Sequence, residues 1–589
     1  MRQGLRNNLT TLLCGCRCTC QSPVVLQSSK RFRLPESSKL KARYSTAAAE
    51  SGTLHDATPQ ASTSNPSLNG RPFRLAVVGS GPAGFYAASR VLSSEGSENA
   101  QVDMFEELPV PFGLVRYGVA PDHPEVKNCI HKFEETAEDK RFRYFGNVRI
   151  GTPLEPEPKQ YDTGAVRASV HHALSLPLSF LKPYYDAILF TYGASYDRSL
   201  GPGVRNDDAP NLLHTLSARS FVHWYNGHPH SPFHQQGKEM GLDALTNATI
   251  IGQGNVALDC ARILLSGREP PTINRLKKTD TPESVLEALS RSTIKHVDVV
   301  GRRGPLQFAG TTKELRELVN LDPKHAQFIM SSDDAALVKE ASQTLESFTS
   351  QGGKTESARM KKRLLQLMQK AKADEKFAKG DTKTWSLSFC KSPVAIEGSE
   401  ENGTAGPVKS VTFEQNDLLP ASNAVLPSND LVDPTSFVAR GTGLTVSRPT
   451  DLLLKSVGYR SGGIEGLPFD QRRGVVKNVE GRVQDDSGDI IPGLYVSGWL
   501  ARGPNGVIAT TMYDAFQTAE TIITDAAAAS STKSLPDLPR LPDAGFGNKQ
   551  VVSWSDWKAI DAEERRRGKA LGKEREKFVR VDDMLKVVQ

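Results

Sequence analysis

Residues 73–84, FRLAVVGSGPAG, constrain the fold more than any other stretch of the chain. The apolar run 75–78 is typical of a buried parallel strand, and it leads through Gly79, Gly81 and Gly84 into a helical pattern. In such a loop the first glycine makes a tight turn, the second lets backbone N–H groups approach a pyrophosphate, and the third allows close helix packing. The stretch therefore predicts a dinucleotide-binding α/β unit, although a plain tight turn can show the same pattern.

Two further features support a nucleotide site. The strand predicted for residues 101–105 ends at Glu106, where an acidic residue can hydrogen-bond an adenosine ribose. A second glycine fingerprint, GQGNVA, begins at Gly252 after the apolar residues 248–251 and ends in alanine, which is a permitted variant. The chain is therefore expected to hold two dinucleotide sites.

A pair of arginines distinguishes the second site. Arg302 and Arg303 follow the strand predicted for residues 296–300, where an NAD site would offer an acid. A guanidinium fork matches phosphate geometry, so the pair favours an adenosine 2′-phosphate and hence NADP. Two surface arginines on a turn are the plainer alternative. The segment 267–293 that separates the fingerprint from this strand is predicted to be an insertion with a short helix of its own.

The positive charge of the chain is concentrated in a leader. Of the 589 residues, with a net charge of +6, the first 44 hold nine basic side chains and one acid, which leaves the remainder at −2. A general nucleic-acid surface is therefore not supported. The leader 1–44 is rich in arginine and serine, as mitochondrial transit peptides are, and cleavage is expected near Arg43. A retained basic arm is the alternative, and residues 45–70 are predicted to be a flexible linker.

The cysteines argue against a metal or disulfide site. Four of the seven lie in the leader at every second residue, which is not the CxxC spacing of zinc or dithiol sites. The other three, Cys129, Cys260 and Cys390, are widely separated. We therefore expect no metal, no disulfide framework and a reducing compartment. Nor does any apolar run reach the length needed to span a bilayer.

Residues 358–372 predict an amphipathic helix with two distinct faces. Met360, Leu364 and Met368 recur at helical spacing on the apolar side, and Arg359 and Arg363 lie one turn apart on another side. Such charges can form a solvated face or a docking patch for an acidic partner. The polar segment 395–445 is predicted to form irregular loops around short strands.

The C-terminal part predicts a return to the first nucleotide unit. A strand at 493–497 meets a glycine turn, and residues 503–512 supply backbone amides that could hold the far end of an extended cofactor. We therefore predict an α/β fold of two Rossmann-like domains in which the second is inserted into a discontinuous first. The first is expected to comprise residues 71–175 and 456–589 with a C-terminal tail, and the second residues 176–455.

Jointly and in this order, the motifs resemble the adrenodoxin reductase family of mitochondrial ferredoxin–NADP reductases. The resemblance runs from about residue 73 through the tail and rests on GSGPAGFYAA, PVPFGLVRYGVAPDHPEVKN, IIGQGNVALDCARILL, VVGRRGPLQ, KELRE, GLYVSGW and RGPNGVIATTM. It implies a disulfide-reductase-like, monomeric flavoprotein of the mitochondrial matrix, peripheral to the inner membrane. The discontinuous domain would bind FAD, the inserted one NADP(H), and the partner would be an acidic, adrenodoxin-like [2Fe–2S] ferredoxin.

The resemblance also implies roles for individual residues. Together with the motif glycines, the FAD set is Gly79, Gly81, Ala83, Gly84, Glu106, Leu114, Ile150, Trp499, Gly506, Val507 and Ile508. The NADP set is Gly252, Gln253, Gly254, Asn255, Val256, Arg302, Arg303 and Glu314, with Gly506 also near the nicotinamide. The ferredoxin-facing arginines are Arg316, Arg359 and Arg363. Asp122, His123 and Asp259 fall near the electron-exit region as catalytic candidates, where an acid could hold the imidazole in one tautomer. A histidine satisfied inside a turn is the alternative for His123.

The reaction implied is hydride transfer from NADPH to the flavin, followed by single-electron transfer to ferredoxin that serves haem monooxygenases or iron–sulfur cluster assembly. A flavin is needed because nicotinamide moves electrons in pairs and an iron–sulfur cluster takes one. A disulfide reductase would need a dithiol, which the body of the chain lacks. A non-catalytic protein should have lost a motif glycine or the arginine pair, and neither is lost. An NADPH-dependent flavin monooxygenase acting on a small organic substrate stays open.

Overall fold

The structure is a computed structural model that describes most of the chain beyond residue 66. By internal contacts the chain divides into residues 1–64 and residues 65–589, and the fold is described for residues 65–589 alone. Within them, the first unit is the part built on the first sheet below, and the second unit is the part built on the second sheet. The residues without description are 1–66, 69, 71, 155–171, 208–211, 236–238, 267–274, 356, 374–381, 402–403, 421–431, 530–534, 542–546 and 548. The predicted transit peptide and nearly all of the predicted linker fall among them. In the described part, every helix is too short or too polar to cross a membrane.

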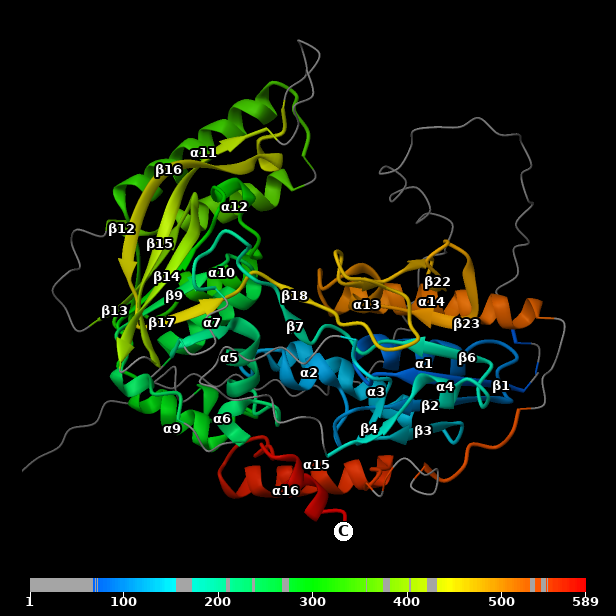
Figure 1. Ribbon diagram of the computed structural model, residues 1–589. Helices are drawn as coiled ribbons and strands as arrows, with labels where there is room; N and C mark the ends of the chain where they lie inside the picture. Colours follow the sequence, from blue (N-terminus) through cyan, green and yellow to red (C-terminus); the bar gives the residue numbers. More distant parts are fainter. Residues whose placement is uncertain are drawn as a thin grey trace, which may run out of the picture. The chain divides into compact units, whose positions relative to one another are not determined.

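The first sheet is built from both ends of the described chain. Its order is β21-β22-β23-β6-β1-β2-β3 (Figure 1). The strands are β1 (Phe73–Val78), β2 (Ala100–Phe105), β3 (Phe142–Phe145), β6 (Ala187–Phe190), β21 (Asn478–Val479), β22 (Arg482–Gln484) and β23 (Ile490–Val496). The strands from β23 to β3 are parallel, and β21 and β22 are antiparallel additions. Helices α1 (Pro82–Leu92) and α14 (Ile508–Ala528) pack against each other on this unit.

The position of β6 corrects the predicted domain boundary. The predicted boundary at residue 176 assigns residues 187–190 to the second domain. In the structure these four buried residues lie between β1 and β23 and pair in parallel with both. The boundary at 176 is therefore too early, because β6 is a central strand of the first sheet.

The second sheet is parallel throughout and has the order β12-β11-β13-β10-β9-β17-β8. Its strands are β8 (Thr215–Ser217), β9 (Asn247–Ile251), β10 (His296–Val300), β11 (Ala326–Met330), β12 (Lys372–Ala373), β13 (Lys383–Ser388) and β17 (Leu452–Lys455). The helices that go with it include α5 (Ala218–Tyr225), α7 (Asn255–Leu265), α9 (Glu283–Arg291), α10 (Thr312–Val319), α11 (Ser332–Ser350) and α12 (Ala358–Met368). Helix α9 confirms the short helix expected within residues 267–293.

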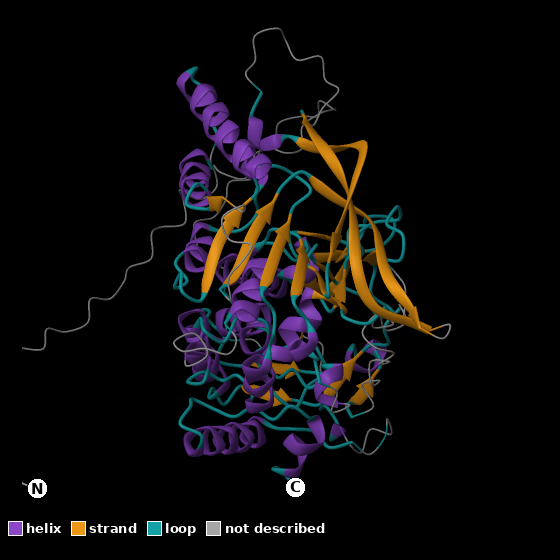
Figure 2. Cartoon of the chain, turned by 90° about the vertical axis from the view of Figure 1, so that its left-hand side faces the viewer, coloured by secondary structure: helices purple, strands orange, loops and turns teal. Residues whose placement is uncertain are grey.

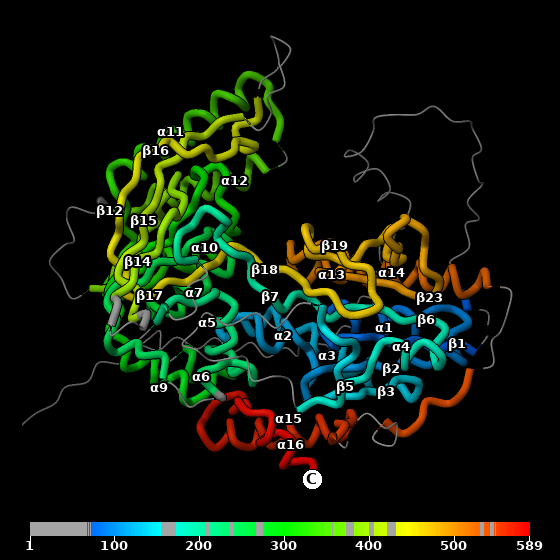
Figure 3. Tube along the Cα trace, in the orientation of Figure 1, coloured from blue at the N-terminus to red at the C-terminus, as the bar shows by residue number. Residues whose placement is uncertain are grey.

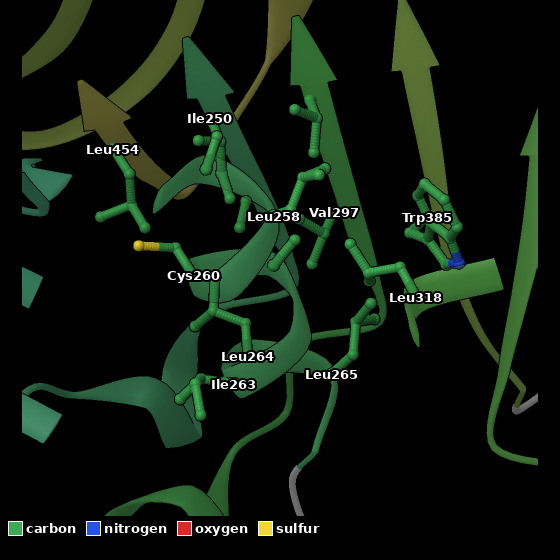
Figure 4. Packing of buried hydrophobic residues seen from close by; sticks show 14 of the residues in the cluster. Ile250, Leu258, Cys260, Ile263, Leu264, Leu265, Val297, Leu318, Trp385 and Leu454 are labelled. Atoms are coloured by element: carbon green, nitrogen blue, oxygen red, sulfur yellow. The ribbon is translucent and has the colours of Figure 1, made fainter. Parts of the chain in front are cut away.

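Apolar packing between α7 and the strands forms the core of the second unit. Leu258 and Leu264 on the helix are fully buried in one cluster with Ile250, Val297 and Trp385 from the strands (Figure 4). Burying a side chain of this size contributes about 1.5–3 kcal/mol, so the cluster fixes the helix on the sheet. The N-terminus of α7 is thereby fixed at the end of β9, where the second glycine loop lies.

A third sheet replaces the irregular loops expected for residues 395–445. Strands β14 (Lys391–Glu401), β15 (Thr404–Leu419) and β16 (Val438–Pro449) form an antiparallel ribbon (Figure 2). The expectation was wrong because it relied on the glycine and proline content of the segment and overlooked that one face of it is buried. Val408, Val411 and Phe413 of β15 are buried with residues of the second unit.

The two crossings between the large sheets run side by side. Strand β7 (Tyr196–Asp197) follows the first sheet in the chain, and β18 (Tyr459–Arg460) leads back towards it. They pair antiparallel as a two-stranded link (Figure 3). The second unit is thus connected to the first by two neighbouring segments, as an inserted domain requires.

The C-terminal tail contacts segments of both units. Helix α15 (Trp554–Ala570) begins with a capping box between Ser553 and Asp556. Beyond it, the buried Lys577 donates to the carbonyl oxygens of Arg116 and Asn226, both at 3.0 Å, and its Nζ lies 2.9 Å from Oδ2 of Asp280. Arg116 belongs to α2 (Gly113–Tyr117) near the first sheet, and Asn226 and Asp280 belong to the second unit.

Candidate functional site

The first glycine loop lies where the sequence predicted it, between β1 and α1. Gly79 has φ +106°, and a Cβ there would lie 2.7 Å from backbone atoms of Thr191 and Tyr192. A Cβ on Gly84 would lie 2.3 Å from the carbonyl oxygen of Gly79. Gly81, the N-cap residue of α1, would meet nothing within 4 Å. The outer two glycines are thus required by packing, and the middle one borders open space at a helix N-terminus.

Glu106 faces this loop from the end of β2. Its Oε2 accepts hydrogen bonds from the Ser80 N–H at 3.0 Å and the Ser80 hydroxyl at 2.6 Å, and its Oε1 accepts from the Leu108 N–H at 3.1 Å. Burial raises the pKa of the Glu106 carboxyl, and these hydrogen bonds oppose that rise. The carboxylate is therefore held in place at the rim of the loop.

The C-terminal segment joins the first loop through a close backbone approach. Gly498 has φ +64°, and a Cβ there would lie 2.9 Å from the Cβ of Ala83. Trp499 opens α13 (Trp499–Arg502) directly after this contact. Val507, which caps α14, is 57% exposed although it is apolar.

The other residues of the expected FAD set differ in accessibility. Ile150 ends β4 (Val148–Ile150) and is buried in an apolar cluster, whereas Leu114 on α2 is half-buried. Gly506 and Val507 are exposed, and Ile508 is half-buried at the start of α14. The chain therefore brings the two halves of this set together around α1, α2 and α14.

The second glycine loop repeats the geometry of the first between β9 and α7. Gly252 has φ +120°, and a Cβ there would lie 2.1 Å from the carbonyl oxygen of Ser456. Gly254 is the N-cap residue of α7, and a Cβ there would meet nothing within 4 Å. Both loops therefore pair one glycine that packing demands with another that borders open space.

Two side chains of the second fingerprint are used inside the protein. Gln253 is buried, and its Nε2 donates to the carbonyl oxygens of Val299 and Ser388, both at 3.0 Å. The Oδ1 of Asn255 accepts from the Thr311 N–H at 2.7 Å, just before α10. These two positions can offer a ligand their backbone N–H groups, whereas their side chains fix the loop.

Arg302 and Arg303 lie after β10 without an acidic partner. Arg302 is exposed and Arg303 half-buried, and within the described ranges neither forms an ion pair. Burial and the charge of Arg302 lower the pKa of Arg303. On nearby α10, the Oε2 of Glu314 is buried and has no hydrogen-bond partner among the described residues. The two arginines repel each other and fit an anionic group of a ligand. The unpartnered oxygen of Glu314 fits a hydrogen-bond donor of the same ligand.

The electron-exit candidates form a network centred on Arg262. This buried guanidinium donates from Nε and Nη2 to the two carboxylate oxygens of Asp122, both at 2.9 Å, and its Nη1 lies 2.7 Å from Oδ1 of Asp259. Burial would raise the pKa of Asp122, but the Arg262 hydrogen bonds hold it below its usual value. Burial raises the pKa of Asp259.

The sequence suggested that Asp122 or Asp259 holds the His123 ring. In the structure the acid that faces His123 is Glu317. The Nε2 of His123 lies 2.6 Å from Oε2 of Glu317, and Nη1 of Arg262 lies 3.6 Å from the same oxygen. Asp122 and Asp259 do not orient the ring because Arg262 occupies their carboxylates. Both missed residues lie inside motifs, Glu317 in KELRE and Arg262 in NVALDCARILL, but only the fold shows that they meet.

The three expected partner-facing arginines lie on neighbouring helices. Arg316 is exposed on α10, and Arg359 and Arg363 are exposed on α12, which packs against α10. The predicted apolar face of α12 was partly wrong, because Met360 is 43% exposed. The residue that lines up with Leu364 and Met368 on the buried side is Lys361.

Within the described ranges, no cluster of three or more histidine, cysteine, aspartate or glutamate residues is arranged to hold a metal ion. Cys129, Cys260 and Cys390 are free thiols.

Known proteins show a consistent pattern of similarity. No family model matches the chain. It is 40% identical to the mitochondrial NADPH:adrenodoxin oxidoreductase of Drosophila melanogaster over 87% of this chain and 93% of that protein. It is 38% identical to the human protein of that name, over 87% and 92%. Among solved structures, Mycobacterium tuberculosis FprA in complex with NADPH aligns with a TM-score of 0.68 and 32% identity, over 88% of this chain and 99% of that one. The chain therefore belongs to the NADPH:adrenodoxin oxidoreductase family.

Proposed function

We propose that this protein is an FAD-containing NADPH:ferredoxin oxidoreductase of mitochondria that passes electrons singly to an adrenodoxin-like [2Fe–2S] ferredoxin. The observation that carries the proposal is the pair of glycine loops, each between a parallel strand and a helix on a separate sheet. Only the second loop has a next strand, β10, that is followed by two arginines without an acidic partner in the described ranges. Such a pair provides one seat for FAD and one for NADP(H) in a single chain. Membership of the family supports the same reaction.

The first loop is the proposed FAD seat. The open space at Gly81 lets α1 direct its N-terminal N–H groups at the pyrophosphate, and Glu106 accepts from the adenosine ribose. Three of about four acceptor positions on that carboxylate are used by Ser80 and Leu108, which leaves room for a hydroxyl. At the other end, Trp499, Gly506, Val507 and Ile508 bound the ring system, with Leu114 and Ile150 on the wall.

The second loop is the proposed NADP(H) seat. Residues at Gly254 and the start of α7 would hold its pyrophosphate, because the first backbone N–H groups of a helix have no partner within the helix. Arg302 and Arg303 hold the 2′-phosphate. Glu314, in the first turn of α10, supplies a hydrogen-bond acceptor for the same ligand. Bound FAD supplies the conversion of electron pairs into single electrons, and the protein supplies position and electrostatics.

The network around Arg262 is proposed to fix the position of the His123 proton and of the charged carboxylates in the electron-exit region. Because a carboxylate oxygen can only accept, Glu317 holds an N–H on Nε2 of His123. Arg262 in turn holds Asp122 and Asp259 in place. These residues position one another, and no nucleophile is needed.

The proposed setting is the mitochondrial matrix, with peripheral contact to the inner membrane and a monomeric enzyme. The composition of residues 1–44 and the word mitochondrial in the names of the relatives support this location. A fusion of residues 1–70 to a fluorescent protein should enter mitochondria. Import that persists after the nine basic residues of the leader are replaced by glutamine would contradict the transit-peptide role.

Exposed arginines on α12 give a direct test of the ferredoxin surface. We expect the double variant R359E/R363E to raise the apparent KM for ferredoxin at least about tenfold in NADPH-dependent cytochrome c reduction, because it reverses charges that steer an acidic partner. Direct reduction of ferricyanide should persist. The salt dependence of the ferredoxin reaction should also weaken.

Arg566→Glu is the matched control, because Arg566 is also an exposed arginine on a helix and its side chain is 71% exposed. It should leave the KM for ferredoxin unchanged. Equal losses of ferredoxin and ferricyanide reduction in R359E/R363E would contradict the docking role. A wild-type rate of NADPH oxidation that needs an organic substrate and not ferredoxin would favour the monooxygenase instead.

A further inference from the structure

Lys361 is a buried lysine that lies on the inner side of α12. Its residue exposure is 9%, whereas Arg359, Met360, Lys362 and Arg363 around it are exposed. The ammonium donates to the carbonyl oxygen of Phe308 at 2.7 Å. No carboxylate among the described residues forms an ion pair with it. Removing an ammonium from water without an acid is costly, so such lysines are rare in protein interiors.

The position of Phe308 places this ammonium beside the arginine pair. Phe308 follows the short helix η4 (Pro305–Gln307), which comes directly after the segment that holds Arg302 and Arg303. Burial and then the charge of Arg303 lower the pKa of Lys361 to about 8. Two of the three N–H donors of Lys361 remain after the bond to Phe308. Lys361 therefore lies close enough to Arg303 for the two charges to repel each other, and Arg302 is the neighbour of Arg303 in the chain.

The surroundings of α12 supply acids, but these do not stabilise the Lys361 charge. Helix α12 packs against α10, α11 and η4. The charged residues of these elements are Lys313, Glu314, Arg316 and Glu317 on α10 and Asp333, Asp334, Lys339, Glu340 and Glu346 on α11. Of the charged groups in the described chain, Arg303 is the one whose charge shifts the pKa of Lys361, and it lowers that pKa. Asp334 pairs with Lys391, and Glu346 pairs with Lys362.

We propose that Lys361 is a third cation for the 2′-phosphate of NADP(H), acting with Arg302 and Arg303 in discriminating NADP(H) from NAD(H). This rests on the proposed assignment of NADP(H) to the second loop. A dianionic phosphate offers the counter-charge that the fold itself does not give these three groups. The bond to Phe308 holds the ammonium at the base of the arginine segment. Lys361 then faces the nucleotide, and the exposed arginines of the same helix face ferredoxin.

Calorimetric titration of the FAD-bound enzyme with 2′,5′-ADP and with 5′-AMP tests this inference without turnover, because the two ligands differ by the 2′-phosphate. Lys361→Gln should weaken 2′,5′-ADP by about tenfold and leave 5′-AMP unchanged, since one charge-assisted contact is lost. Lys361→Arg should retain most of the affinity. Lys362→Gln, a change of the exposed neighbour, should have no effect on either ligand.

The pH profile of the wild-type enzyme gives a second readout that needs no variant to fold. The ammonium is charged below its folded pKa of about 8 and loses its proton above it. The affinity for 2′,5′-ADP should therefore fall as pH rises from about 7 to about 9.5, while the phosphate stays dianionic. In Lys361→Arg the affinity should stay nearly constant over this range, because arginine keeps its charge.

The outcomes separate the role of Lys361 from the NADP assignment. Wild-type enzyme that binds 2′,5′-ADP no better than 5′-AMP would overturn both. Strong wild-type discrimination that survives Lys361→Gln, with a flat pH profile, would overturn the Lys361 role alone. Equal weakening of the two ligands in Lys361→Gln would show that the lysine only anchors α12 to Phe308.

Discussion

Replacing Arg302 and Arg303 together with alanine should raise the KM for NADPH on the order of a hundredfold and change the KM for NADH less than about threefold. Both guanidinium groups lie at the end of β10 and lack an acidic partner within the described ranges. Their removal therefore takes away contacts to the 2′-phosphate without leaving a buried carboxylate unpaired. Because NADH has no 2′-phosphate, the cofactor preference should nearly disappear.

Steady-state ferricyanide reduction with each nicotinamide measures this effect, because it does not depend on ferredoxin. The conservative variant R302K/R303K should lose less, since it keeps the charge but not the planar fork. A parallel rise in the KM for NADPH and NADH would mean that the arginines shape the loop rather than bind the phosphate.

Replacing Glu564 with alanine should lower the free energy of unfolding by about 3–5 kcal/mol. Glu564 is fully buried on α15, and both of its oxygens accept from Nη2 of Arg116 at 2.7 Å. It also accepts from the Phe578 N–H at 2.9 Å and faces Arg575 at 3.3 Å. The variant would leave the buried Arg116 without its counter-charge.

Urea unfolding of the FAD-bound enzyme, followed by tryptophan fluorescence, measures the loss as a shift of the first transition. Glu563→Ala is the matched control, since Glu563 pairs with the exposed Arg566 on the same helix and its removal should leave the unfolding midpoint nearly unchanged. Equal midpoints for the two variants would show that the tail is not anchored through Arg116. Because Lys577 follows closely in the tail, loss of this anchor should also loosen its contacts with Asn226 and Asp280.

The parts of the site that could be predicted from sequence are those that local geometry dictates. Gly79 and Gly252 have positive φ and leave no room for a Cβ, so a glycine at each of these positions in the sequence predicts the turn. The parallel strand before each loop is a short apolar run, and the hydrophobic pattern and the length of such a run predict a buried strand. Both loops therefore occur where the motifs place them.

Contacts between distant segments could not be predicted in this way. His123 and Glu317 are 194 residues apart, and only the packing of α10 near the first unit brings them together. The inward position of Lys361 was missed because a hydrophobic pattern selects Met360 for the apolar face. Residues 187–190 look like any buried strand, and their place in the first sheet depends on β23, which lies about three hundred residues later in the chain.

Anaerobic transfer between the purified partners tests the ferredoxin reductase function most directly. The FAD-bound enzyme is reduced with one equivalent of NADPH and then mixed in a stopped-flow instrument with an excess of oxidised [2Fe–2S] ferredoxin. We predict that the flavin absorbance recovers fully while about two ferredoxin molecules are reduced per FAD, because a hydride carries two electrons and each cluster accepts one. Ferredoxin that stays oxidised, with a flavin that recovers only when oxygen and an organic substrate are added, would contradict this function.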